Sequence, residues 1–159
     1  MAQWASAWAP VLLWMAVIAW LSGDSFSDDQ TAVWLADVPL VAALGLPPAA
    51  IDTANLILRK SGHFVEYATL GLLAFRALRG GSGLRSPRTC LVGAVSIAVV
   101  YASLDELHQT WTLTRSGTVH DVVIDGLGAS AGALLGARIV RGRGVRSGDA
   151  AEPPPRPLA

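Results

Sequence analysis

Apolar residues occur in long, nearly unbroken runs along this chain, and polar residues gather between the runs. The first run covers residues 4–22, and residues 1–23 contain no Asp, Glu, Lys or Arg. Its length is close to the roughly 20 residues that a helix needs to cross a bilayer. A cleaved signal peptide would begin with basic residues, whereas the opening MAQWASAWAP has none. We therefore expect this run to form a first transmembrane helix.

Three further runs are long enough to cross a membrane as helices: residues 54–78, 88–109 and 118–140. The first of the three carries four charged or ionisable side chains between residues 59 and 66. Such side chains are costly in contact with lipid near the bilayer centre, so they must face protein or water. The pattern predicts an all-α fold, an integral membrane bundle of four transmembrane helices.

The connection between the first two predicted helices, residues 24–53, is acidic and contains no Lys or Arg. Its middle part, VPLVAALGLPPAA at 38–50, is apolar but too short and too interrupted by proline to span a bilayer. It is either a short interfacial or re-entrant segment or an apolar loop. We favour contact with the membrane interface.

Basic residues concentrate on one side of the predicted bundle. They form one cluster after the second helix and one after the fourth: Arg76, Arg79, Arg85 and Arg88, then Arg138, Arg141, Arg143 and Arg146. Because positively charged loops remain in the cytoplasm, we expect both termini to be cytoplasmic. The last residues, GDAAEPPPRPLA, are rich in proline and poor in apolar side chains. We therefore divide the chain into a membrane domain at 1–142 and a disordered cytoplasmic tail at 143–159.

The composition agrees with a membrane protein. Charged residues make up 15% of the chain and hydrophobic residues 52%, and the mean hydropathy is +0.45. Twelve basic residues balance twelve acidic ones, so no overall positive field would attract nucleic acid. Cys90 is the sole cysteine, which excludes an internal disulfide, a cysteine-rich zinc site and an iron–sulfur cluster. We expect no cofactor.

With the basic loops inside, ionisable residues of three predicted helices fall in the outer leaflet. They are Lys60, His63, Glu66 and Tyr67 in the second helix, Asp105, Glu106, His108 and Gln109 in the third, and Asp121 and Asp125 in the fourth. At about 100° per residue, Asp105, His108 and Gln109 are expected to share one face of the third helix. The polar residues of three separate segments therefore converge on one leaflet.

A stripe of small residues continues from the two aspartates of the fourth helix. Asp121 and Asp125 are four residues apart, and Gly128, Gly132 and Gly136 follow on the same face. Small residues at this spacing let another helix approach closely. We therefore expect the aspartates to point into the bundle.

Two strings of this sequence resemble the VanZ-like family of small bacterial membrane proteins, which is named for an accessory factor in teicoplanin resistance. They are LRKSGHFVEYATLGLLAFRAL and SLDELHQTWTLTRSGTVHDVVIDGLGASAG, and the similarity covers about residues 57–136. The order and spacing of their polar and glycine residues carry the resemblance. One departure is Thr110-Trp111, where the family tends to show a Phe-rich segment before the arginine. The resemblance implies a multi-pass protein of the bacterial cytoplasmic membrane that acts at the cell envelope.

The polar cluster allows three interpretations. His63, Glu66, Asp105 and His108 offer nitrogen and oxygen ligands, but no HExxH or comparable compact motif occurs, so we predict no metal. The same four residues are the candidates for acid–base catalysis on a lipid or glycan substrate. The third interpretation is a buried charge network that holds the helices together or binds an anionic headgroup. In this network Lys60, Arg115 and the histidines would offset Asp105, Glu106, Asp121 and Asp125. The candidate ligand-binding residues are Lys60, Tyr67, Glu106, Gln109, Arg115, Asp121 and Asp125.

These interpretations lead to competing functions. The first is a non-catalytic protein that lowers susceptibility to teicoplanin-like glycopeptides or tends a lipid-linked envelope component. The alternatives are a membrane-embedded acid–base enzyme and a proton-coupled carrier, because intramembrane charges also mark proton relays. The expected partners are membrane lipid and a lipid-linked cell-wall precursor or a glycopeptide. We expect Arg59 to be an interfacial charge that snorkels to the membrane surface.

Overall fold

The computed structural model describes residues 2–23, 28–81, 86–110 and 118–149, and these residues form helices without a strand. The helices are α1 (Ala2–Leu21), α2 (Asp28–Ala36), α3 (Pro39–Ala43), α4 (Pro48–Gly81), α5 (Pro87–Gln109) and α6 (Val119–Asp149). The all-α prediction is confirmed for this part of the chain. Helix α6 continues seven residues beyond the expected domain boundary at 142, and residues 150–159 lie outside the described part.

Three of the described helices are long and apolar enough to cross a membrane: Ala2–Leu21, Pro87–Gln109 and Val119–Arg141. The expected second span is not among them, because the charged and polar side chains within α4 lower its hydropathy. Large apolar side chains such as Val92, Val100 and Leu127 are about 60% exposed on the outside of α5 and α6. An exterior of this kind is unusual for a water-soluble monomer and suits contact with lipid.

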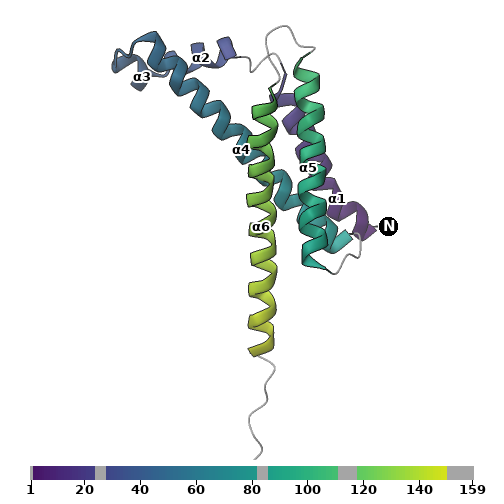
Figure 1. Cartoon of the computed structure of the whole chain (residues 1–159). Helices are drawn as coiled ribbons and strands as arrows, with labels where there is room; N and C mark the ends of the chain where they lie inside the picture. Colours follow the sequence, from purple (N-terminus) through teal and green to yellow (C-terminus); the bar gives the residue numbers. More distant parts are fainter. Residues whose placement is uncertain (1, 24–27, 82–85, 111–117, 150–159) are drawn as a thin grey trace, which may run out of the picture.

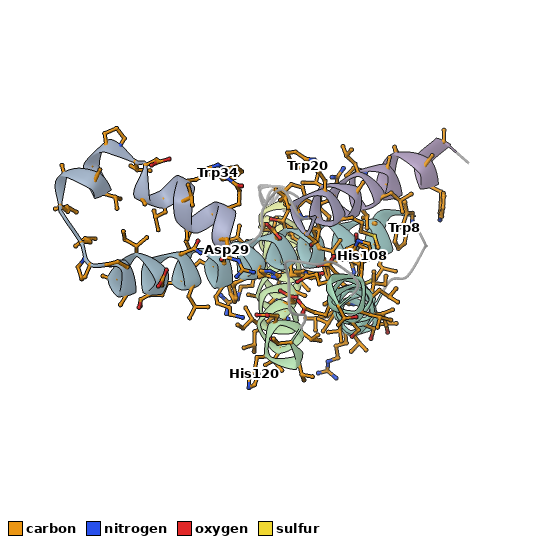
Figure 2. All side chains as sticks on the ribbon, turned by 90° about the horizontal axis from the view of Figure 1, so that it is seen from above. Trp8, Trp20, Asp29, Trp34, His108 and His120 are labelled. Carbon is orange, nitrogen blue, oxygen red and sulfur yellow. The ribbon has the colours of Figure 1, made fainter. Side chains whose placement is uncertain are left out.

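Helix α4 occupies the centre of the bundle and contacts α1, α5 and α6. Figure 1 shows α5 and α6 side by side, with α4 crossing them obliquely and α1 behind α5. The view from above in Figure 2 places α1 on one side of α4, and α5 and α6 on the other. The charged residues of α4 therefore lie where other helices surround them.

The segment at 38–50, expected to be an interfacial or apolar loop, is partly helical. It contains the short helix α3 and the first turn of α4, and α2 precedes it. Proline stands at the first helical position of both α3 and α4, where its missing N–H costs no helical hydrogen bond. Gly45 between them has a φ of +59°, a left-handed conformation that glycine adopts without a steric penalty. Figure 2 shows α2 and α3 folding back along the first half of α4.

The predicted glycine stripe of α6 packs directly against the backbone of α4. A Cβ atom built on Gly128 would lie 3.1 Å from the carbonyl carbon of Phe64, and one on Gly132 would lie 2.6 Å from that of Ala68. Alanine and larger apolar side chains complete the core on either side. The expectation that small residues bring a helix close and turn the aspartates inward is confirmed.

Hydrogen bonds fix α1 against α4 and α5. The indole Nε1–H of Trp14 donates to the carbonyl oxygen of Glu66 at 2.9 Å, and the hydroxyl of Tyr101 donates to that of Met15 at 2.5 Å. Ser22, just after α1, donates to Asp105 near the end of α5 at 2.7 Å. The carboxyl ends of α1 and α5 therefore meet, which makes the two helices parallel.

Candidate functional site

Ionisable and polar side chains from four helices meet at one end of the bundle, which we call the polar end. Its described members are Ser22 after α1, Lys60, His63, Glu66 and Tyr67 on α4, Asp105, Glu106 and Gln109 on α5, and Thr118, Asp121 and Asp125 at the start of α6. The predicted convergence of three polar segments is thus found in the structure, with a fourth contribution from the end of α1.

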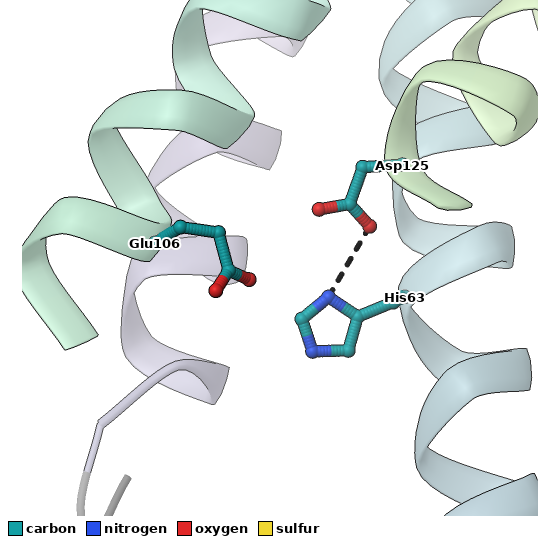
Figure 3. A group of neighbouring side chains, drawn as sticks. All are labelled: His63, Glu106 and Asp125. Carbon is teal, nitrogen blue, oxygen red and sulfur yellow. Dashed lines mark hydrogen bonds and ion pairs between the residues drawn. The ribbon is translucent and has the colours of Figure 1, made fainter. Parts of the chain in front are cut away.

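A histidine–aspartate pair lies at the centre of the polar end. His63 Nδ1 is 3.2 Å from Asp125 Oδ1, and the Asp125 side chain is completely buried while that of His63 is 11% exposed. Figure 3 shows the two groups facing each other from α4 and α6, with the Glu106 carboxylate approaching from α5. The glycine stripe below Asp125 makes this contact geometrically feasible, because it holds α6 against α4.

Lys60 and Asp121 form a second pair one turn nearer the end of the bundle. The Asp121 carboxylate also accepts a hydrogen bond from the Thr118 hydroxyl at 2.8 Å, and that hydroxyl accepts from the Asp121 backbone N–H at 3.3 Å. The second of these bonds is that of an N-terminal cap, in which a Thr hydroxyl accepts from the backbone N–H three positions later. The start of α6 is therefore fixed by the same aspartate that pairs with Lys60.

Helix α5 contributes two adjacent buried carboxylates with different partners. Asp105 accepts hydrogen bonds from Ser22 at 2.7 Å and from the Gln109 side chain at 3.1 Å. Glu106 Oε2 accepts from the Thr118 backbone N–H at 2.7 Å, which links α5 to the start of α6. Asp105 is thus surrounded by neutral donors, whereas Glu106 turns toward His63 and Asp125.

Several buried oxygens at the polar end have no hydrogen-bond partner among the described residues. They are Tyr67 Oη, Glu106 Oε1 and Asp125 Oδ2. A buried polar atom without a partner costs about 1–3 kcal/mol, so most such atoms in native proteins are satisfied. Two of these oxygens belong to the carboxylates beside His63, and they mark a place that a proton, an ion, water or a ligand would complete.

A cavity of about 120 Å³ opens beside His63 between α1, α2 and α4. Its lining residues are Leu21, Ser22, Thr31, Arg59, Gly62, His63 and Glu66. Hydroxyl, imidazole, guanidinium and carboxylate groups therefore surround a space that borders the buried pair. Arg59, which we expect to be an interfacial charge, also lines this cavity and gives it a cation.

One predicted site residue, His108, lies outside the buried cluster. His108 is exposed whereas Asp105 and Gln109 are buried, so the buried face expected to hold all three residues is wrong. Figure 2 labels His108 near the end of α5. The buried arc of α5 runs through Asp105, Gln109 and Glu106, and His108 falls roughly 60° outside it. Arg115 lies outside the described residues.

Sequence reasoning did not select Ser22, Thr31 or Thr118 for the site. Thr118 carries a readable signal, because Thr-Val-His-Asp at 118–121 has the spacing of an N-terminal cap before an apolar run. Ser22 and Thr31 carry none, since a hydroxyl residue at the end of a helix or in α2 is common without a role. The structure also replaces the metal-ligand set considered from sequence with His63, Glu106 and Asp125, whose ligand atoms lie within 4.8 Å of one another.

Comparison with known proteins identifies the family of this chain. No match to a curated protein or to a solved structure was found. The profile of the VanZ/LLP1 family matches residues 7–141. This range includes nearly all of α1, the whole of α2 to α5, and every residue of the polar end. Because the match covers most of the sequence, the chain belongs to the VanZ/LLP1 family.

Proposed function

We propose that this protein crosses the bacterial cytoplasmic membrane four times and binds the anionic headgroup of a lipid-linked envelope component at its polar end. The observation that carries the proposal is the cavity beside His63, which combines the guanidinium of Arg59 with the hydroxyl of Thr31. Guanidinium and hydroxyl groups are suited to phosphate, and the adjacent Glu66 is suited to the hydroxyls of a sugar. A contribution to glycopeptide resistance would follow from such binding.

The parallel direction of α1 and α5 supports the fourth crossing. Both helices qualify as spans, and the contact of Ser22 with Asp105 places their carboxyl ends on the same side. The chain between them must therefore return across the membrane, and α4 is the helix that does so. Its 34 residues extend about 51 Å at 1.5 Å per residue, well beyond the roughly 30 Å hydrocarbon core.

The positions of the arginines support a cytoplasmic location for both termini. Arg76 and Arg79 near the end of α4, Arg88 at the start of α5, and Arg138 and Arg141 in the second half of α6 lie away from the polar end. Basic residues favour the cytoplasmic side. The polar end then faces outward, where lipid-linked cell-wall precursors meet glycopeptides.

The size of the cavity favours a headgroup over a whole glycopeptide. Pockets that enclose a drug-sized ligand measure about 300–1,000 Å³, whereas this cavity measures about 120 Å³. It suits a small polar group whose lipid tail remains in the bilayer. Teicoplanin susceptibility would then change through the precursor that the drug recognises. Arg115 stays a predicted partner of the same phosphate.

A second candidate function is acid–base catalysis on the same lipid, and the buried His63–Asp125 pair favours it. A carboxylate that orients an imidazole is a recurring arrangement for proton transfer, and His63 also lines the cavity. In this case a bound headgroup would be altered, and His63 would be the catalytic residue. Glu66 and Asp105 stay predicted as further catalytic residues beside it.

Lipid binding can be measured on the full-length protein in nanodiscs. Native mass spectrometry with a lipid-linked peptidoglycan precursor, and with phosphatidylcholine as the comparison, should show selective retention of the precursor. Arg59→Gln removes the cavity's guanidinium and should weaken this retention by about tenfold or more, since hydrogen bonds to charged groups contribute roughly 1.5–3 kcal/mol. The matched control is Arg88→Gln, an exposed arginine outside the polar end.

The same variants distinguish binding from catalysis. Under the binding proposal, expression in a Gram-positive host changes teicoplanin susceptibility, and Arg59→Gln abolishes the change more fully than His63→Gln. Under the catalytic alternative, His63→Gln binds the precursor normally but leaves it unaltered. Equal retention of precursor and phosphatidylcholine by the wild-type protein would contradict both.

A further inference from the structure

Three side chains from three different helices converge at the centre of the polar end. His63 on α4, Glu106 on α5 and Asp125 on α6 each direct one nitrogen or oxygen to a common space, and these atoms lie within 4.8 Å of one another. Figure 3 shows the three groups pointing toward the same space. Glu106 and Asp125 are at least nine-tenths buried, with exposures of 6% and 0%. Such a group differs from the exposed acidic clusters that are common on protein surfaces.

A second observation points to an occupant. Each carboxylate satisfies one oxygen within the protein, Glu106 through the Thr118 N–H and Asp125 through His63. The other oxygen of each, Glu106 Oε1 and Asp125 Oδ2, is buried without a hydrogen-bond partner in the described part of the chain. Two buried carboxylates with one unsatisfied oxygen each are costly, because an ionised group removed from water needs a compensating charge.

We propose that His63, Glu106 and Asp125 bind one divalent transition-metal ion, Zn²⁺ or Mn²⁺. Metal-to-ligand bonds of about 2.0–2.2 Å place tetrahedral ligand atoms roughly 3.3–3.6 Å apart. The separation of 3.2 Å between His63 Nδ1 and Asp125 Oδ1 is already near this value. The Glu106 ligand atom lies within 4.8 Å of the other two and would have to move closer by at most about 1.5 Å. Three protein ligands leave a further coordination position, as in catalytic rather than structural zinc sites.

The ligand set decides the class of ion. An imidazole nitrogen favours Zn²⁺ and related transition metals, whereas Mg²⁺ and Ca²⁺ prefer all-oxygen sites. The two carboxylates extend the choice to Mn²⁺. Nδ1 cannot both donate to Asp125 and bind a metal, so the ion would replace this hydrogen bond, with the imidazole in the neutral tautomer that carries its proton on Nε2. The charge of the ion would offset both carboxylates, which a protonated histidine alone does not.

The inference concerns the ion alone and does not rest on the proposed lipid binding. A protein that retains a metal but no precursor would keep this inference and lose the proposed function. A protein that retains the precursor but no metal would keep the proposed function and lose this inference. Because His63 also lines the cavity, a bound metal and a bound headgroup would lie on neighbouring sides of the same imidazole.

The test uses the full chain, purified in detergent with an affinity tag that contains no histidine. After incubation with Zn²⁺ or Mn²⁺ and desalting, inductively coupled plasma mass spectrometry should find about one ion per chain, as a single three-ligand site requires. Glu106→Gln keeps the shape of its side chain and should reduce metal affinity by roughly tenfold or more, since even changes to groups behind the ligands cost 10–100-fold. His63→Gln should do the same.

The control for His63→Gln is His120→Gln, which alters an exposed histidine on α6 and should retain the metal. If Glu106→Gln fails to fold, the wild-type protein still tests the proposal, because EDTA should lower its melting temperature and added Zn²⁺ or Mn²⁺ should restore it. Metal well below one ion per chain in the wild type, or equal retention by Glu106→Gln and His120→Gln, would overturn the inference. So would a melting temperature that neither EDTA nor metal moves.

Discussion

Gly132→Ala tests whether the close approach of α4 and α6 holds the bundle together. A Cβ atom at this position would lie 2.6 Å from the carbonyl carbon and 3.0 Å from the Cα atom of Ala68. Both are backbone atoms inside a helix, so they cannot rotate away as the end of a flexible side chain would. The two helices must therefore separate along the stripe, which removes contacts at Gly128 as well.

The magnitude follows from the kind of obstruction. Overpacking by one methyl group typically costs 1–3 kcal/mol, and a backbone obstacle places this site at the upper end, about 3 kcal/mol. For a chain of this size, that corresponds to a melting temperature lower by roughly 6–12 °C. The sole cysteine provides the assay, because Cys90 is fully buried in the core beside Phe75. A thiol-reactive fluorescent maleimide therefore reports the unfolding of the purified protein as the temperature rises.

Gly126→Ala is the matched control on the same helix. Its added Cβ would meet Val99 Cγ2 at 3.4 Å, an ordinary van der Waals distance, so we expect a melting temperature close to that of the wild type. Indistinguishable melting curves for Gly132→Ala and Gly126→Ala would refute the reasoning. They would mean that the helices are not held at the separation described.

Two further predictions test the charges and the topology. Lys60→Met leaves the buried Asp121 without its cation and should destabilise the protein by about 2–3 kcal/mol, less than for a fully buried pair because Lys60 is 35% exposed. Adding Asp121→Asn should restore much of the loss in the same thermal assay, and a double variant as unstable as the sum of the single ones would refute the pairing. For the topology, single cysteines introduced at Asp37 and at Arg88 in a Cys90→Ser background should differ in their labelling in intact cells. A membrane-impermeant maleimide should label only Asp37→Cys, and labelling only of Arg88→Cys would reverse the proposed orientation.

The helices of the bundle could be predicted from the chain because lipid imposes a simple requirement on sequence. A membrane helix must be long and apolar, and the expected runs at 88–109 and 118–140 begin within one residue of α5 and α6. The structure of the segment at 38–50 was harder to predict, because short helices that begin at proline give no clear periodicity of apolar residues. Helix α4 was ambiguous for a different reason: its charges are satisfied by α6, which hydropathy does not detect.

The polar end could be predicted only in part, since rotation about a helix axis is set by its neighbours. The inward direction of Asp121 and Asp125 was predictable, because glycines on the same face identify the packed side. The direction of α5 could not be predicted, because its polar residues Asp105, Glu106, His108 and Gln109 spread over an arc of about 160°. Spacing alone favoured His108 over Glu106, and the packing of α5 against α4 and α6 reversed that choice.

The glycine stripe connects the packing of this protein to its chemistry. Between helices in lipid there is no hydrophobic force to hold them together, so attraction depends on close contact and on polar groups that meet across the interface. Gly128 lies one turn below Asp125, and the approach that it permits brings the Asp125 carboxylate within reach of His63. A larger residue in the stripe would therefore separate the pair as well as the helices. For this reason a loss of function in a stripe variant is evidence about the site only when the fold is shown to persist, whereas the shape-preserving changes at Glu106 and His63 examine the chemistry with the stripe intact.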